Sequence, residues 1–144
     1  IADGAAGVLV GLRGERALLA AGGLCHRDSV SVGLEPRLCG LGAIVATTRL
    51  QERNADLDPA EMDQVAMTEA FASQMVATID ALALDAARVN PHGGAIALGH
   101  PWGASGAAQV VRLHTDLRPG QQGLALAAVA GGMGSAAWFV AETA

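Results

Sequence analysis

The chain has 144 residues, about one domain's worth, and its 9 basic residues against 14 acidic residues give a net charge of −5. Apolar residues make up 51% and charged residues 16%, which is enough to build a core and too apolar for a disordered segment. A net acidic chain without lysine is a poor candidate for binding nucleic acid, and no apolar run approaches the ~20 residues of a membrane span.

Small residues dominate the composition, with 19 glycines and 31 alanines. A chain of this kind lets backbone segments approach one another, and a ligand, very closely. The two cysteines, Cys25 and Cys39, make no disulfide framework, and no CxxC or HExxH pattern suggests a metal site. We therefore expect a reducing, cytoplasmic location.

The first third of the chain predicts two strands and two helices. Residues 1–10 predict a buried strand, and residues 13–21 a short helix that the following glycine pair ends. Residues 29–34 alternate polar and apolar side chains, the period of a strand with one buried face. Residues 43–54 are expected to be helical.

The middle of the chain predicts a helical turn, a strand and a long helix. Asp58 suits an N-cap, with Pro59 at the first helical position and Glu61 at the third. Residues 64–67 predict a buried strand. Residues 69–84 predict the clearest helix, because apolar residues recur there at helical spacing.

The last third predicts a helix and two strands. A glycine-rich loop over residues 91–103 leads into a predicted helix at 104–117. Strands are predicted at 123–129 and 135–140, with a tight turn at 131–134 between them. The order βαβαβαββ indicates an α/β layer architecture.

The loop around His100 is the first candidate for chemistry. Its glycines let the backbone approach a ligand, and the helix that follows offers unpaired N–H groups at its N-terminus. A histidine such as His100 can be neutral near pH 7 and exchange protons with a nucleophile. Taken alone, a single histidine in a loop is more often structural than catalytic.

The glycine-rich turn at residues 131–134 is the second candidate. Consecutive N–H groups in such a turn can form an oxyanion hole, which stabilises negative charge on a carbonyl oxygen. An ordinary hairpin turn would have the same sequence, so the turn alone does not decide between the two.

Four segments together resemble one family. The string GGAIALGHPWGASG at residues 93–106 closely resembles the carboxy-terminal signature of the thiolases, the acetyl-CoA acyltransferases. GLALAAVAGGMG at 123–134 looks like the last signature of that family, and TEAF at 68–71 looks like its Asn-Glu-Ala-Phe motif. DGAAGVLV at 3–10 resembles the family's DGAAAVLV strand. The order and spacing of all four agree over nearly the whole chain.

The resemblance implies a thiolase-fold half, layered α/β/α around a mixed five-stranded sheet. Residues 1–22 would be the final strand and helix of the amino-terminal thiolase half, and residues 23–144 the carboxy-terminal thiolase domain. In the family, the nucleophilic cysteine lies in the first half, which is absent here. Another chain, or a lost stretch of this one, would then supply it.

The resemblance also assigns roles at the reaction centre. His100 matches the histidine that activates the nucleophile and polarises a thioester carbonyl. Thr68 stands where the family has an asparagine that holds a water for the first oxyanion hole. Backbone N–H groups near Ala130 and Gly131 match the second hole. Ala128 stands at the position of the acid/base cysteine and cannot transfer a proton.

Further positions match the substrate tunnel. Phe71 matches a residue that lines the pantetheine tunnel, Met133 lies in the last signature, and Cys39 sits in the tunnel loop where methionine is common. His92 replaces the family's asparagine before the glycine pair. His92 and Cys39 are the titratable candidates for replacing the missing acid/base, although each also fits a tolerated loop side chain.

Two functions remain open. The first is a carboxy-terminal subunit or fragment of a thiolase-like acyl-CoA acyltransferase, which supplies His100 to a cysteine on the missing half. It would work as a hetero-oligomer with a thiolase-type dimer core, on a coenzyme A or acyl-carrier thioester, without a bound cofactor or metal. Because Ala128 lacks a proton donor, the reaction would be a non-standard acyl transfer or condensation. The alternative is a catalytically degenerate half that serves as a structural partner.

Overall fold

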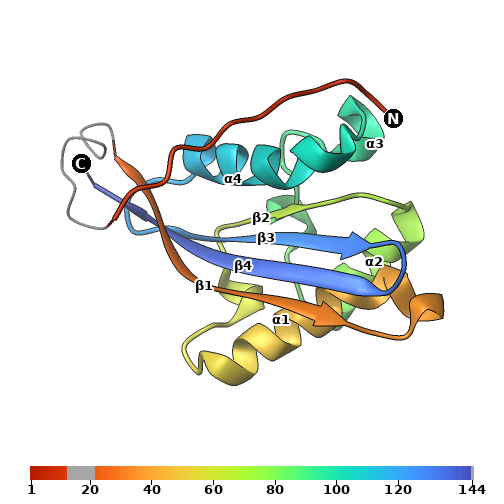
Figure 1. Ribbon diagram of the computed structural model, residues 1–144. Helices are drawn as coiled ribbons and strands as arrows, with labels where there is room; N and C mark the ends of the chain where they lie inside the picture. Colours follow the sequence, from red (N-terminus) through yellow and green to blue (C-terminus); the bar gives the residue numbers. More distant parts are fainter. Residues whose placement is uncertain (13–21, 144) are drawn as a thin grey trace.

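The computed structural model describes residues 1–12 and 22–143, and within them a four-stranded mixed sheet forms the centre of the fold (Figure 1). The strands are β1 (Gly23–Gly33), β2 (Gln64–Met67), β3 (Gln122–Val129) and β4 (Met133–Glu142). Their order across the sheet is β1-β4-β3-β2. β2 and β3 are parallel, whereas β4 runs antiparallel to both of its neighbours, β1 and β3. β1, β2 and β3 therefore all finish at the same end of the sheet.

Helices cover both faces of the sheet, which gives the three layers α/β/α (Figure 1). α4 (Ser105–Asp116) packs on one face, and α1 (Gly42–Arg53) and α2 (Ala72–Ala81) lie on the other. The remaining helices are short: η1 (Pro36–Leu41), η2 (Pro59–Glu61), η3 (Ala86–Arg88), α3 (Ala95–Leu98) and η4 (Trp102–Ala104).

The core divides into two clusters because the sheet is buried on both faces. Leu124 and Leu126 of β3 pack into the cluster that α1 and α2 cover, whereas Ala125 between them packs toward α4. Successive strand residues point to opposite faces, so a strand buried on both faces is apolar without alternation. All four residues of β2 are buried for the same reason.

Glycine allows α1 to cross very close to β4. A Cβ at Gly42 or at Gly134 would overlap the backbone of the other element. Because neither glycine has a Cβ, the backbones of the two elements are in direct contact here, and the first turn of α1 packs on the beginning of β4.

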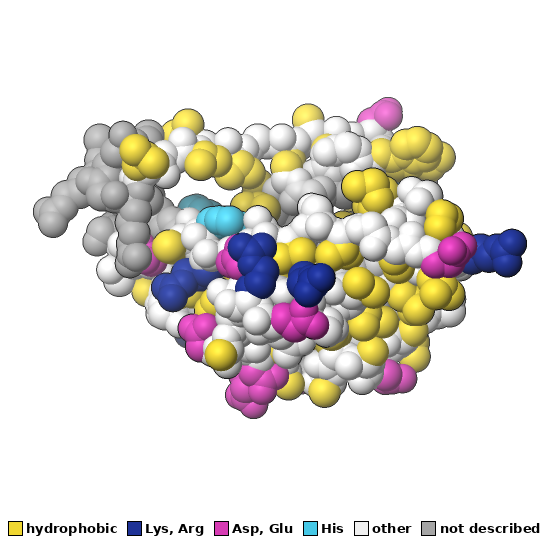
Figure 2. All heavy atoms as spheres, turned by 60° about the horizontal axis from the view of Figure 1, so that its bottom comes forward, with side chains coloured by type: hydrophobic (Ala, Val, Ile, Leu, Met, Phe, Trp, Pro, Cys, Tyr) yellow, Lys and Arg dark blue, Asp and Glu magenta, His cyan; other side chains and the backbone are white. Residues whose placement is uncertain are grey.

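The surface that contains α1 carries two kinds of side chain (Figure 2). Arginine and acidic side chains alternate across its middle, and hydrophobic side chains gather toward the right of that view, where η1 and α2 lie. Exposed apolar residues of this region come from η1, α1 and α2 and from the residue before α2: Leu38, Leu41, Val45, Phe71 and Val76.

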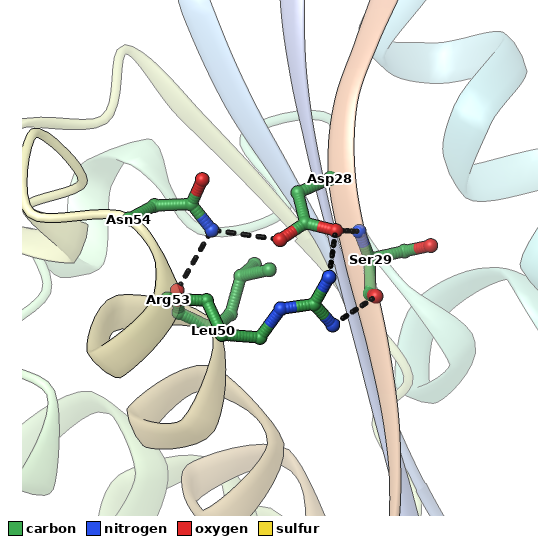
Figure 3. Close-up of polar contacts among 5 residues, drawn as sticks. All are labelled: Asp28, Ser29, Leu50, Arg53 and Asn54. Atoms are coloured by element: carbon green, nitrogen blue, oxygen red, sulfur yellow. Dashed lines mark hydrogen bonds and ion pairs between the residues drawn. The ribbon is translucent and has the colours of Figure 1, made fainter.

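A polar cluster joins β1 to the C-terminal end of α1 (Figure 3). The Asn54 amide donates to Asp28 Oδ2 at 2.8 Å and to the Leu50 carbonyl at 2.9 Å. Arg53 Nη2 lies 3.0 Å from Asp28 Oδ1, which also accepts from the Ser29 N–H at 2.8 Å. The Asn54 hydrogen bond, the Ser29 N–H and the positive charge of Arg53 together lower the pKa of Asp28.

The prediction of a strand at residues 1–10 is wrong. Residues 1–12 contain no strand and run over α4, where Leu9 and Val10 are 79% and 82% exposed (Figure 1). A strand requires a neighbour to pair with, and within the described part of the chain none lies beside this segment.

The sheet accordingly has four strands in the described residues, not the five that we expected. Beyond β2, one parallel bridge between Val65 and Val89 continues the sheet by a single residue. The helix predicted at 13–21 lies outside the described residues, and the domain boundary at residue 22 stays a prediction.

The helix predicted at 69–84 is shorter than expected, because Phe71 has an extended backbone (φ −147°, ψ 146°) and α2 begins only at Ala72. The helical turn after Asp58 is confirmed: its carboxylate accepts from the Ala60 N–H at 3.0 Å. The layered α/β/α class is likewise confirmed.

Candidate functional site

His100 is held by the first residue of α4. Its Nδ1 lies 2.6 Å from the Ser105 hydroxyl oxygen. Because Ser105 belongs to a helix of 12 residues, its position is fixed by the packing of α4 on the sheet. This contact occupies Nδ1, so proton exchange with a bound group falls to Nε2.

A pocket of about 180 Å³ opens beside His100, and the N-terminal segment forms part of its wall through Ala2 and Asp3. Besides Asp3, its polar lining comes from the residue after β2, from the glycine-rich loop and the residue Asn90 just before it, and from α4. These polar residues include Thr68, Asn90, His100, Ser105, Gln109 and Arg112. The structure therefore brings together His100 and Thr68, two residues that are 32 positions apart in the sequence.

Thr68 follows directly on β2 and is fixed by two hydrogen bonds. Its N–H donates to the Leu126 carbonyl at 3.0 Å, and its hydroxyl accepts from Gln109 Nε2 at 2.8 Å. Gln109 Nε2 also donates to the Leu126 carbonyl at 3.1 Å. α4 is thereby connected to the end of β2 and to β3 through one side chain.

Asn90 ties the loop to the end of β2. Its carboxamide accepts from the Met67 N–H at 2.9 Å and donates to the Met67 carbonyl at 2.8 Å. It also donates to Glu69 Oε1 at 2.7 Å, and Glu69 Oε2 accepts from the Ile96 N–H at 2.8 Å. Asn90 has a positive φ of 44°, a conformation that asparagine tolerates better than most residues.

The glycines of the loop are required by close contacts. A Cβ at Gly94 would overlap the Glu69 carboxylate, and Gly99 has φ +92° while it packs against Ala2. Arg112 of α4 donates to the Gly93 carbonyl. The loop that carries His100 is therefore anchored to β2, to α4 and to the N-terminal segment.

The turn between β3 and β4 lies outside this pocket. Ala130 and Gly131 are exposed, and Gly131 and Gly132 have φ near +90°. Ala128 faces Gly134 in the β3–β4 register. A Cβ at Gly132 would overlap the Leu34 carbonyl, so the turn rests on the chain that leads into η1.

The predicted tunnel residues lie at the same end of the sheet as the pocket, but they do not line it. Cys39 belongs to η1, which packs against α2 and the β3–β4 ends. Phe71 precedes α2 and is 73% exposed, and Met133 begins β4 and is 53% exposed. Phe71 and Met133 are exposed, Cys39 is half-buried, and none of the three lines the pocket beside His100.

His92 is separated from the pocket. Its Nε2 lies 3.7 Å from Asp116 Oδ2, at the last residue of α4, and its side chain is 70% exposed. Ser105, which contacts His100, is the first residue of that helix. At 1.5 Å per residue, it lies about 16 Å along the helix from Asp116. The structure therefore does not bring His92 to His100 as a replacement acid/base.

The sequence did not identify several residues of the pocket. Ser105 lines the pocket and lies inside the motif at residues 93–106, so its place near His100 was a usable signal. Glu69 does not line the pocket but holds Asn90, and it lies inside the motif at 68–71. Asn90 and Glu69 are 21 positions apart, and no sequence period connects them. Gln109 carries one signal only, a polar side chain on the face of α4 that meets the sheet.

No group of three or more His, Cys, Asp or Glu side chains within the described residues is arranged to hold a metal ion. None of the helices that the structure describes combines the length and apolar character that crossing a membrane requires.

The sequence profile described as "Thiolase, C-terminal domain" matches residues 24–142. The peroxisomal 3-ketoacyl-CoA thiolase of Saccharomyces cerevisiae is 38% identical over 143 residues, which cover 99% of this chain and 34% of that protein. A putative acetyl-CoA C-acetyltransferase of Staphylococcus haemolyticus is 43% identical over 81% of this chain and 30% of its own length. The chain thus spans about a third of the length of the curated relatives it matches.

A solved structure agrees with this similarity. The crystal structure of coenzyme A-bound Acat5 thiolase from Ascaris suum superimposes with a TM-score of 0.80 at 33% identity. The match covers 88% of this chain and 34% of that one. The four-stranded sheet and its two helix layers therefore have the same arrangement as one part of a thiolase.

Proposed function

The chain belongs to the thiolase family through its match to the C-terminal domain, and from this premise we propose that it contributes His100 to acyl transfer from a coenzyme A thioester. The observation that carries the proposal is the contact of 2.6 Å between His100 Nδ1 and the Ser105 hydroxyl oxygen at the N-terminal end of α4. Holding Nδ1 in this way orients the ring and leaves Nε2 to take a proton from a thiol nucleophile.

The nucleophile is proposed to lie outside this chain's 144 residues. The relatives are about three times as long, and the S. cerevisiae peroxisomal thiolase is described as a five-layered structure of two core domains with identical topology. We propose that the present domain pairs with a region carrying the amino-terminal half and its cysteine, on another chain or on a further stretch of this one. On another chain, the assembly would be a hetero-oligomer with a thiolase-type dimer core.

The reaction itself is proposed to be non-standard. Ala128 offers a methyl group where the resemblance implies an acid/base cysteine, and neither Cys39 nor His92 lines the pocket beside His100. Acyl transfer to another nucleophile, or decarboxylative condensation, requires no proton transfer by that residue. Coenzyme A or an acyl carrier supplies the thioester, and we place the reaction in the cytoplasm, since Cys25 and Cys39 are both free thiols.

The same alanine favours the second candidate function, a degenerate half that completes the fold of an active partner. Under that hypothesis His100 is a remnant, and the contacts that matter are those between the two halves. The two candidates therefore differ in the expected effect of removing the imidazole.

The test is acyl transfer from acetyl-CoA by the complex that co-purifies with this chain, with His100→Ala compared with wild type. We expect a loss of about 10²–10⁴ in rate, the usual contribution of a positioned acid/base. Ser105→Ala should cause a smaller loss of about tenfold, the worth of one hydrogen bond, and Ser105→Thr should restore the rate because the hydroxyl is kept.

The matched control is His114→Ala, which removes an exposed imidazole from the same helix as Ser105. It should leave the rate unchanged. An equal rate in the His100→Ala complex and the wild type would contradict the catalytic proposal and favour the structural one. The intact mass of the co-purifying chain would show whether it carries a thiolase nucleophile motif.

A further inference from the structure

Gln109 is a polar side chain on the face of α4 that meets the sheet. Its Nε2 donates to the Leu126 carbonyl of β3 at 3.1 Å and to the Thr68 hydroxyl at 2.8 Å. A carboxamide nitrogen carries two hydrogens, so both are used by these two acceptors. Gln109 also lines the pocket beside His100.

The Leu126 carbonyl fixes which way the Gln109 carboxamide faces. In the reversed orientation, Oε1 of Gln109 would point at a carbonyl oxygen, and two acceptors would repel each other. Leu126 cannot move away, because its carbonyl also accepts from the Thr68 N–H at 3.0 Å. The nitrogen of Gln109 is therefore held toward Thr68.

This orientation determines what Thr68 can do. A threonine hydroxyl can donate one hydrogen and accept two. Since its oxygen accepts from Gln109, its own hydrogen must point elsewhere, and Thr68 lines the same pocket as His100. Without Gln109, the hydroxyl would be free to turn its hydrogen toward the backbone.

We propose that Gln109 is a positioning residue that holds the Thr68 hydroxyl as a hydrogen-bond donor into the His100 pocket. The acceptor is the oxygen of a thioester carbonyl, or a water bound to it, on which negative charge develops during acyl transfer. The identity of that acceptor rests on the proposed function, whereas the orientation of Thr68 rests on the hydrogen bonds alone.

The kinetic test uses the complex described above with three variants. Gln109→Leu removes the donor, and Gln109→Glu replaces it with an isosteric acceptor. Removing one donor from an oxyanion site costs about 10²–10³ in kcat, so loss of its orientation should lower kcat by about tenfold or more with little change in KM. Gln51→Glu on α1 is the matched control and should retain the wild-type kcat.

Rescue separates orientation from packing. In the double variant Thr68→Asn with Gln109→Leu, the asparagine carries its own donors and does not depend on Gln109. We expect it to regain most of the kcat that Gln109→Leu loses. A Gln109→Glu complex with wild-type kcat, or a double variant no better than Gln109→Leu, would overturn the proposal.

A second readout does not depend on turnover. Hydrogen exchange of the side-chain amides, followed by NMR on the full chain with labelled glutamine, should be about tenfold slower for Gln109 than for Gln51, because hydrogen bonds must open first. Equal exchange rates would overturn the arrangement itself. Slow exchange in a complex without acyl transfer would instead count against the proposed function and leave the orientation of Thr68 supported.

Discussion

Asp28 is held in its charged form by the residues around it. The Asn54 amide, the Ser29 N–H and the Arg53 guanidinium all interact with its carboxylate and lower its pKa (Figure 3). Because Asn54 also donates to the Leu50 carbonyl, the Asp28 carboxylate connects β1, directly after its register shift between His26 and Asp28, to the last turn of α1. The charge of a single residue thus contributes to holding a helix on the sheet.

Acidification should weaken this connection. A carboxyl whose pKa is lower in the folded protein stabilises the fold above its unfolded pKa of about 3.9, and that stabilisation is lost as the pH falls toward the folded pKa. We therefore expect Asp28→Asn to lower the free energy of unfolding at pH 7, with the difference from wild type shrinking as the pH falls below about 4.

Urea unfolding of both proteins at a series of pH values measures this difference. Asp56→Asn is the matched control, since Asp56 is exposed, and its effect should be small at every pH. A deficit of Asp28→Asn that is the same at pH 7 and pH 3 would show that the charge of Asp28 is not what stabilises the α1–β1 contact.

At the scale of elements, the sequence predicted most helices and strands, because their apolar periods are determined locally. Residues 64–67 were predicted as a buried strand and form β2. The helix predicted at 69–84 begins late because Phe71 is extended, and the Glu69 carboxylate before it accepts from the N–H of Ile96, 27 positions away. The strand predicted at 1–10 failed for a related reason: local pattern does not reveal whether a pairing neighbour exists.

The residues of the candidate site likewise fall into those that a local motif predicted and those that it did not. Motif residues such as His100 and Thr68 were predicted and line one pocket. Gln109 and Asn90 were not, because their importance comes from hydrogen bonds to residues 41 and 23 positions away. His92 was a titratable candidate for replacing the missing acid/base, but its imidazole lies beside Asp116, at the far end of α4 from Ser105 and His100.

The close contact between Gly42 of α1 and Gly134 of β4 should tolerate no added side chain. Gly134→Ala should destabilise the fold by about 1–3 kcal/mol or more, because the new methyl group would overlap the Gly42 carbonyl and push helix and strand apart. Thermal and urea unfolding measure the change.

Gly33→Ala is the control for that substitution. Gly33 ends β1 beside the same part of β4, yet no atom lies within 4 Å of a Cβ placed there. Its effect should stay within about 0.5 kcal/mol. Equal stability of the two variants would mean that α1 can shift without cost.

At the scale of the whole molecule, the sheet separates two cores. Leu50 of α1 packs in one and Leu113 of α4 in the other, and both are fully buried. Each Leu→Ala substitution should cost about 2–5 kcal/mol. Because the two residues share no cluster, their costs should add within about 0.5 kcal/mol in the double variant.

Urea unfolding of the two single variants and the double variant tests this independence. Leu9→Ala is the control, since Leu9 is 79% exposed and should contribute little. Strong non-additivity would show that the sheet transmits packing changes from one face to the other, and that the two layers behave as one core.

Asn90 also limits how this domain can associate with others. β2 forms one border of the sheet, and an uncovered border strand is a template for pairing with a strand from another molecule. The Asn90 carboxamide bonds to both the N–H and the carbonyl of Met67, so it takes the place that a neighbouring peptide group would fill. Together with the Val65–Val89 bridge, this side chain leaves Met67 no free backbone group with which a strand from another molecule could pair.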